Sequence, residues 1–261
     1  MRSIFAFLTF VTVTPILASI VLLAALFRVR DRAGSVYDRL PRLWSRIVLR
    51  AAGVKVIVHN EERAQQGQPR IFVSNHVSWS DVFTLAAVLR RYKFVGKAEL
   101  FRIPLFGRAA YASGMIAIER DNRKAAFDSY RLAAERVRDG ASVVVYPEGS
   151  RGTTYTLRPF KIGPFVLASA AGVPIVPTVL YGTMGVFPKD TWWRVRSGTV
   201  HVHFLEEIPT EGTTYEDRKG LAALCWRRMA DALEREYGIV SDRPHGSGEP
   251  RGKSPALVEH A

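Results

Sequence analysis

The sequence has a single cysteine, Cys225, among 261 residues, and it is short of acidic side chains. One cysteine excludes a disulfide scaffold and a cysteine-based zinc cluster, and it fits a reducing compartment. With 24 Asp and Glu against 37 Lys and Arg, the formal net charge is +13. Such an excess indicates a polyanionic partner, either nucleic acid or an anionic membrane surface.

Features of nucleic-acid-binding proteins are also missing. We find neither a recognition helix nor a set of aromatic stacking platforms, so we expect no nucleic-acid partner. A disordered chain is excluded as well, because charged residues make up 23% of the sequence and aromatic residues 11%. A chain of 261 residues instead suits one α/β domain of ordinary size.

What the sequence does have is a long apolar run near its start. Residues 4–27 carry no charge and lie between Arg2 and Arg28. As a helix this run would be about 36 Å long, against a hydrocarbon core of about 30 Å. Pro15 would kink such a helix, so we expect either a membrane-spanning helix or a bent, half-inserted helical hairpin. A cleaved signal peptide is the rival interpretation, but the run is long for one and no clear small-x-small cleavage site follows.

Arginines are frequent directly after the apolar run, at Arg28, Arg30, Arg32, Arg39, Arg42, Arg46 and Arg50. This flank is typical of the cytoplasmic side of a membrane, where anionic headgroups attract it. We therefore expect a membrane protein whose main domain lies on the cytoplasmic face, as at a bacterial inner membrane. Residues 37–52 are predicted to form a basic amphipathic helix that lies either at the membrane interface or against the domain.

Beyond residue 53, short β-branched runs alternate with helical periodicity. We expect strands at 54–59, 71–74, 93–95, 115–118, 142–146, 175–181 and 199–205, and helices at 81–91, 121–138, 165–171 and 216–237. Strands separated by helices predict an α/β fold with a mixed, mainly parallel sheet flanked by helices. The expected organisation is a membrane-associated part at 1–52, a main domain at 53–240 and a disordered tail at 241–261 that is rich in Gly, Pro and Ser.

The first candidate site is the segment from Asn75 to Asp81, where a predicted strand ends and a helix begins. Strand carboxyl ends are where α/β folds carry their chemistry. His76 can accept a proton near neutral pH, and a carboxylate behind it would fix its tautomer. A five-residue offset across a turn can bring Asp81 to that place. The alternative is a loop histidine beside an Asp that only caps the helix.

A second candidate, Tyr146-Pro147-Glu148-Gly149-Ser150-Arg151-Gly152, again follows a buried-type strand. Its glycines allow a tight turn whose N–H groups could face an anion, and Arg151 offers a planar fork suited to phosphate. The segment lacks the spacing of a P-loop. Read alone, it is equally a glycine-rich surface turn.

Lys97 and Arg120 each follow an apolar stretch, which would place them at the mouth of the sheet. Read individually, each is equally well a solvated surface charge. His201 and His203 alternate on one predicted strand and would share a face as a pair of metal ligands. No third ligand is evident from the sequence, so we interpret the pair as structural and expect no metal.

An activated nucleophile is not apparent. The chain has no GxSxG elbow, and nothing around Cys225 favours a thiolate. Direct attack of one substrate on another would need only a base, positioning of the substrates and an oxyanion donor, and the sequence does not identify that donor. A covalent route through Ser78, which lies between His76 and Asp81, is the alternative.

Together these segments resemble the 1-acylglycerol-3-phosphate acyltransferase family of glycerolipid synthesis, over about Ile71 to Tyr181. The family's His-x-x-x-x-Asp motif matches His76 and Asp81, and its Phe-Pro-Glu-Gly-Thr-Arg motif matches Tyr146–Arg151. Further matches are Ile118-Glu119-Arg120, Phe160-Lys161-x-Gly163 and Val173–Pro177. The chain departs from the family in Ser150 for Thr, Gly152 for a usual Ser, and Ala98 for a frequent Lys.

The resemblance implies acyl transfer from acyl-coenzyme A or acyl carrier protein to the 2-hydroxyl of lysophosphatidate, giving phosphatidic acid without a cofactor. It puts His76 in the general-base position, Asp81 in the orienting position and Arg120 at an acceptor-binding position, with Glu148, Gly149 and Ser150 in a substrate-binding motif. We expect Arg151, Lys97 and Arg120 to hold the acceptor's phosphate, and membrane phospholipids to be partners. The alternatives are an acyltransferase for another lyso-lipid, such as lysophosphatidylcholine or lyso-ornithine lipid, and a non-catalytic lipid-binding protein.

Overall fold

A computed structural model describes residues 2–65, 67–119, 123–188 and 194–242. Within these ranges the chain forms one seven-stranded sheet with the order β1-β7-β6-β2-β5-β3-β4. Every neighbouring pair is parallel except β6 and β7, so the mixed, mainly parallel sheet predicted from the sequence is confirmed. The strands are β1 (Val54–His59), β2 (Ile71–Ser74), β3 (Tyr92–Lys97), β4 (Ile116–Ile118), β5 (Ser142–Val145), β6 (Ile175–Tyr181) and β7 (Gly198–Phe204).

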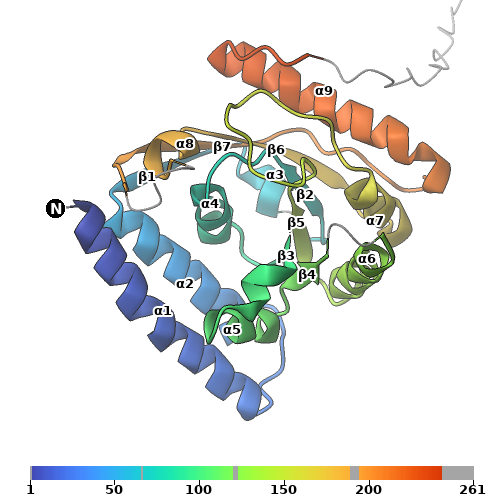
Figure 1. Ribbon diagram of the computed structural model, residues 1–261. Helices are drawn as coiled ribbons and strands as arrows, with labels where there is room; N and C mark the ends of the chain where they lie inside the picture. Colours follow the sequence, from blue (N-terminus) through green and yellow to red (C-terminus); the bar gives the residue numbers. More distant parts are fainter. Residues whose placement is uncertain (1, 66, 120–122, 189–193, 243–261) are drawn as a thin grey trace, which may run out of the picture.

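Helices cover both faces of the sheet (Figure 1). Side chains alternate along β2, so Ile71 and Val73 belong to one core cluster and Phe72 to another. The first cluster is shared with α6 (Arg123–Arg138), α7 (Gly163–Ala171) and α9 (Arg218–Tyr237). The second is shared with α4 (Ser80–Val88), which in turn packs on α2 (Val36–Ala51). Burial on both faces explains why the central strands read as continuous apolar runs.

The remaining helices are short, except for the first. They are α3 (Glu62–Gln65), α5 (Phe106–Ala112), α8 (Thr183–Val186) and the 3₁₀ helices η1 (Ala98–Arg102) and η2 (Tyr215–Asp217). The first, α1 (Arg2–Leu26), continues through Pro15 as one helix, so residues 4–27 do not form the hairpin that was the alternative expectation. It packs against α2 and α5, and α1 and α2 together make an N-terminal helical hairpin (Figure 1). The indole Nε1 of Trp44 on α2 donates to Thr14 Oγ1 of α1 at 2.9 Å.

Most of the α1 surface is apolar and exposed. Its outward side chains include Ile4, Phe5, Leu8, Ile16 and Leu26, each more than half exposed. By length and composition, α1 is able to cross a membrane. An apolar face of this size is expected to lie against lipid or another apolar partner.

A buried ion-pair network joins this hairpin to the sheet. Lys93 on β3 is fully buried, and its Nζ lies 2.8 Å from Asp31 Oδ2 and 3.7 Å from Asp38 Oδ1. Arg91 contacts both of the same carboxylates at 3.3 Å. A buried ammonium is tolerated only when it is paired, so Lys93 requires the carboxylates of Asp31 and Asp38 beside β3.

Several element ends differ from the sequence-based predictions. The helix expected to reach Arg91 ends at Val88, because Leu89 is extended with φ −68° and ψ 148°. The last helix begins at Arg218, since Thr214 caps a preceding 3₁₀ turn. The tail expected from residue 241 lies almost wholly outside the described residues, and the hydroxyl of Ser241 accepts a hydrogen bond from the amide of Leu157.

Candidate active site

His76 and Asp81 meet across the turn between β2 and α4. The imidazole Nδ1 lies 2.8 Å from Asp81 Oδ2. The Asp81 side chain is fully buried, while the His76 side chain keeps 12% of its surface exposed. The carboxylate is therefore shielded from water, and one edge of the imidazole remains open to a substrate. The pairing predicted from the five-residue offset is present.

The same carboxylate oxygen also organises the turn. Oδ2 of Asp81 accepts the backbone N–H groups of Val77 at 2.7 Å and Ser78 at 2.8 Å. A carboxylate can only accept, so the proton of a neutral His76 ring resides on Nδ1 and points at Asp81. That leaves Nε2 with its lone pair as the basic atom of the site.

The segment from Tyr146 to Gly152 is hydrogen-bonded to the backbone of His76 through Glu148 and Gly152. Glu148 Oε1 accepts the backbone N–H of His76 at 3.0 Å, and the N–H of Gly152 donates to the His76 carbonyl at 2.7 Å. Glu148 is itself buried and paired with Arg158, whose Nε lies 3.0 Å from Oε2. The Glu148 loop therefore acts as a brace for the histidine backbone.

Tyr146, at the start of the same loop, stacks on the imidazole of His76. Its hydroxyl is buried and has no hydrogen-bond partner among the described residues. Burial, and to a lesser extent the charge of Asp81, raise the pKa of Tyr146 well above its ordinary value. The ring is thus a neutral, apolar wall for the imidazole at any physiological pH.

The hydroxyl of Ser78 is committed to the fold. It donates to the carbonyl of Phe187 at 2.8 Å and accepts the N–H of Ser80 at 3.1 Å, and the residue is fully buried. An attacking hydroxyl would need to face the substrate and a base. The geometry therefore disfavours the covalent route through Ser78.

The three predicted phosphate ligands differ in their surroundings. The Arg151 guanidinium lies over the ring of Trp79, 4.9 Å from its centroid, and so beside the His76 turn. Lys97 is the last residue of β3, half exposed, and its Nζ pairs with Glu99 at 2.8 Å. Arg120 lies outside the described residues. β3 is parallel to β5, and β5 is parallel to β2, so the carboxyl ends of these strands lie on the same side of the sheet. Lys97 therefore lies on the side where His76 follows β2 and Glu148 follows β5.

Two basic residues near the site were not assigned a role from the sequence. Arg158 neutralises Glu148, and its Nη1 also donates to the Ser150 hydroxyl at 2.9 Å. The stem of Lys161 lies over Gly149, where an added Cβ would come within 2.8 Å of Cε. Gly149 also has a φ of +79°, so glycine is required there twice over. The resemblance of Phe160-Lys161-x-Gly163 to a family motif is the sequence feature that could have predicted the position of Lys161 in the site.

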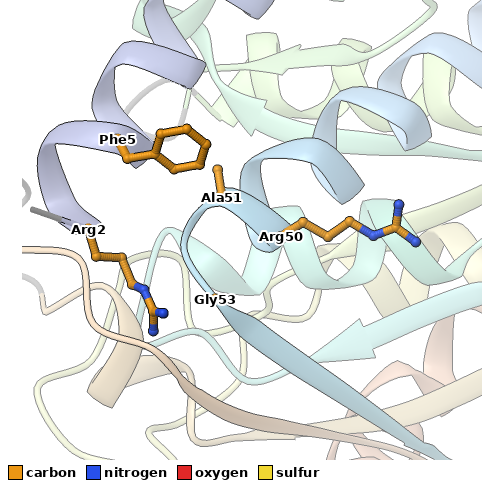
Figure 2. Close-up of a pocket in the computed structure, with 5 residues that line it drawn as sticks. All are labelled: Arg2, Phe5, Arg50, Ala51 and Gly53. Atoms are coloured by element: carbon orange, nitrogen blue, oxygen red, sulfur yellow. The ribbon is translucent and has the colours of Figure 1, made fainter.

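One hollow on the described surface lies away from the His76 turn. It measures about 460 Å³ and is lined by Arg2, Phe5, Arg50, Ala51 and Gly53, at the junction of α1 and α2 (Figure 2). The Arg2 side chain reaches toward Gly53, and Phe5 faces Ala51 (Figure 2). No base or carboxylate lines this hollow, so it does not compete with the His76 turn as a site of chemistry.

The described residues include one group of side chains able to hold a metal ion, and it does not include His76. His201 and His203 do lie together, as alternation predicted, and His59 joins them. The chemistry available at the His76 turn is therefore that of an oriented base beside cations.

Comparison with known proteins places this geometry in a family. A family model described as acyltransferase matches residues 55–181. The chain is 36% identical over 202 residues to human 1-acyl-sn-glycerol-3-phosphate acyltransferase beta, covering 77% of this chain and 71% of the relative. It is 34% identical over 163 residues to a chloroplastic 1-acyl-sn-glycerol-3-phosphate acyltransferase of Brassica napus, covering 62% of this chain. The alignment spans about half of that relative, 47% of its length.

A solved structure shares the fold. The crystal structure of the 1-acyl-sn-glycerophosphate acyltransferase from Thermotoga maritima matches with a TM-score of 0.66 and 21% identity. The match covers 91% of this chain and 99% of the other. The α/β architecture with its N-terminal helices is therefore the acyltransferase architecture expected from the sequence.

Proposed function

The chain belongs to the 1-acyl-sn-glycerol-3-phosphate acyltransferase family, and on that premise we propose that it acylates the 2-hydroxyl of 1-acyl-sn-glycerol-3-phosphate. The product is phosphatidic acid. The donor is a thioester, carried by coenzyme A or by acyl carrier protein. This co-substrate already activates the acyl group, so the proposal needs no further cofactor.

His76 acts as the general base. Its Nε2 accepts the proton of the acceptor hydroxyl while the oxygen attacks the thioester carbonyl. Collapse of the tetrahedral intermediate breaks the C–S bond, and the imidazolium returns the proton to the leaving sulfur. Asp81 holds the ring in the required tautomer and stabilises its charged form. One ester bond is formed, one thioester bond is broken, and His76 ends as it began.

One observation supports this mechanism above all others, namely the 2.8 Å contact between His76 Nδ1 and a fully buried Asp81. A surface pair would be worth little, because water screens it. Here the carboxylate is dry, and its Oδ2 also accepts two backbone N–H groups. An orienting carboxylate of this kind is what a base needs to stay aimed at one hydroxyl.

Arg151, Lys97 and Arg120 bind the phosphate of the acceptor. A phosphate monoester carries close to two negative charges near neutral pH. Arg151 beside the His76 turn offers two N–H groups at once, whereas Lys97 acts as a point charge. Binding would draw Lys97 from Glu99, a pair that is half exposed and therefore weakly held.

The enzyme works at a membrane, with α1 in the lipid and the catalytic domain on the cytoplasmic face. The exposed apolar side of α1 and the following arginines support this placement. Its two lipids, acceptor and product, then stay within the bilayer. Only the donor has to arrive from water.

The test is release of free thiol by purified protein in detergent. The donors are acyl-coenzyme A and acyl carrier protein, and the acceptors are lysophosphatidate, lysophosphatidylcholine and a lyso-ornithine lipid. We expect thiol release to depend on lysophosphatidate, with phosphatidic acid identified by mass. His76→Ala is the matched inactive control.

Each other outcome contradicts part of the proposal. Faster reaction with another lyso-lipid would replace the acceptor while keeping the acyl transfer. Thiol release without any acceptor would indicate a thioesterase. Tight lipid binding with no thiol release from either donor would indicate a lipid-binding protein.

A further inference from the structure

Three histidines from two neighbouring strands meet on the face of the sheet that α9 covers. His59 is the last residue of β1, and the parallel register pairs it directly with His203 of β7. His201 lies two residues earlier on β7 and so projects to the same side. One ring nitrogen of each histidine lies within 4.8 Å of those of the other two. His59 Nε2 and His201 Nδ1 are 3.1 Å apart.

A fourth side chain holds the cluster from outside. The hydroxyl of Tyr237, the last residue of α9, lies 2.6 Å from His203 Nε2. Tyr237 is fixed in turn by stacking on Tyr181 of β6, with ring centroids 3.7 Å apart. With Nε2 held by Tyr237, Nδ1 is the His203 nitrogen left to coordinate. A hydrogen bond to the second ring nitrogen is the usual support of a metal-binding histidine.

The donor set also selects a class of ion. The group contains three imidazoles and no carboxylate or thiolate. The carboxylate of Glu236, next to Tyr237 in sequence, is paired with Arg235 at 2.9 Å. Mg²⁺ and Ca²⁺ prefer oxygen ligands, whereas imidazole suits Zn²⁺, Ni²⁺, Co²⁺ and Cu²⁺.

We propose that His59, His201 and His203 bind one divalent transition-metal ion of the zinc class, with water in the remaining position. His59 and His203 now stack face to face, 4.0 Å between centroids, so a ring must rotate about its Cβ–Cγ bond on binding. The nitrogen separation of 3.1 Å between His59 and His201 is close to the roughly 3.3 Å between two ligands of a tetrahedral zinc. The register of β1 and β7 places His203 directly beside His59, so the third ligand is already next to the other two.

The site would serve the fold and not the acyl transfer. His76 is not a member of the group. A bound ion would join β1, an edge strand of the sheet, to β7, with Tyr237 linking the site to α9. Metal that binds only the native state stabilises it by mass action. The proposal is independent of the proposed acyltransferase activity.

The experiment uses tag-free, full-length protein, stripped with a chelator and returned to chelator-free buffer. Zn²⁺ is titrated against a chromophoric competitor, and Co²⁺ is added separately for its visible spectrum. We expect one equivalent of Zn²⁺ per chain, the intense absorption of tetrahedral Co²⁺, a raised thermal midpoint and no competition from Mg²⁺. His59→Gln and His201→Gln should each weaken binding at least about 100-fold, and Tyr237→Phe, which keeps the stacked ring, about 10-fold.

The controls separate this site from other histidines. His76→Ala, and the double variant His245→Gln/His260→Gln, should bind Zn²⁺ as the wild type does. Circular dichroism of the stripped variants establishes that they are folded, and the two substituted histidines, His59 and His201, are both only partly buried. The proposal is overturned if the wild type binds no stoichiometric ion, or if binding survives in His59→Gln and His201→Gln. It is equally overturned if binding is lost in His76→Ala.

Discussion

The ring of Tyr146 lies flat against the imidazole of His76, with centroids 4.1 Å apart and planes inclined by 18°. Asp81 accepts a hydrogen bond from Nδ1 at the edge of the same imidazole. The hydrogen bond restricts rotation of the ring, and the stacked tyrosine restricts its movement perpendicular to the ring plane. On its other side Tyr146 stacks with Phe94, at 6.2 Å and 12°. The imidazole of His76 is therefore the last of three nearly parallel rings, after Phe94 and Tyr146.

Tyr146→Phe should raise stability without a cost in activity. The substitution keeps the stacked ring and removes a buried hydroxyl that has no partner among the described residues. Relief of that desolvation should contribute about 1 kcal/mol, or about 2–4 °C in thermal midpoint. Tyr146→Ala, the control, should lower turnover by up to about 100-fold because the imidazole loses its wall. A less stable Tyr146→Phe protein would mean that the hydroxyl has a partner.

His76→Ala should abolish transfer while the protein remains folded and bound to membranes. A positioned general base contributes roughly 10²–10⁴ in rate, and alanine accepts no proton. Asp81→Asn should lose much of the rate at unchanged fold, because the amide no longer fixes the tautomer. Turnover by thiol release decides the matter. More than about a tenth of wild-type turnover in His76→Ala would contradict the mechanism.

Arg151→Ala should raise the Michaelis constant for lysophosphatidate by roughly 10- to 100-fold, equivalent to about 1.4–2.8 kcal/mol. The guanidinium of Arg151 lies over Trp79, next to the His76 turn, and it can donate two hydrogen bonds to one phosphate. Arg151→Lys should recover only part of the loss, since lysine binds as a point charge. Arg138→Ala, an exposed arginine on α6, is the matched control. Unchanged lysophosphatidate saturation in Arg151→Ala would remove Arg151 from the phosphate site.

Deletion of residues 1–30 should release much of the protein from membranes and lower activity on lipid acceptors. The truncation removes the exposed apolar face of α1 but keeps Asp31, the partner of Lys93. The remaining arginines should then bind anionic lipid in a salt-sensitive way. Sedimentation with vesicles at low and high salt measures this, and deletion of 243–261 is the control. Full sedimentation of the truncated protein in high salt would locate the anchor elsewhere.

Cys225 should resist thiol reagents in the native protein. Its side chain is fully buried on α9, and burial raises the pKa of the thiol far above its ordinary value. Almost no thiolate is then present at pH 8, where an unfolded cysteine would react. One thiol per chain should appear only on unfolding, with Cys225→Ala as the blank. Rapid labelling of the folded protein would show that α9 opens locally.

The contacts that could be predicted from the sequence are those between residues close together in the chain. His76 and Asp81 lie within one strand-to-helix turn, so their spacing alone limits how far apart they can be. Tyr146 lies 70 residues after His76, and its place over the imidazole depends on β5 pairing with β2. Strand order of this kind is set by packing of the whole sheet, and no short motif specifies it.

The histidine cluster and the buried lysine could not be predicted either, because both depend on contacts between residues far apart in sequence. His201 and His203 could be placed on one strand face by alternation, but His59 is 142 residues from His201 in sequence. Lys93 is predicted to lie in a strand, and nothing near it in sequence indicates full burial, because its partners are Asp31, between α1 and α2, and Asp38, in α2. Long-range charge pairing is specified by tertiary structure alone.

Burial of Lys93 against Asp31 and Asp38 also links the order of synthesis to the order of assembly. The ribosome delivers α1 and both aspartates before β3, so the two carboxylates are already present when Lys93 is synthesised. A sheet that closed without them would bury an uncompensated ammonium, at a cost of several kcal/mol. A chain that failed to dock its N-terminal hairpin would therefore remain partly open and sensitive to proteases. On the proposed membrane placement, folded enzyme should accumulate only after α1 has entered the lipid.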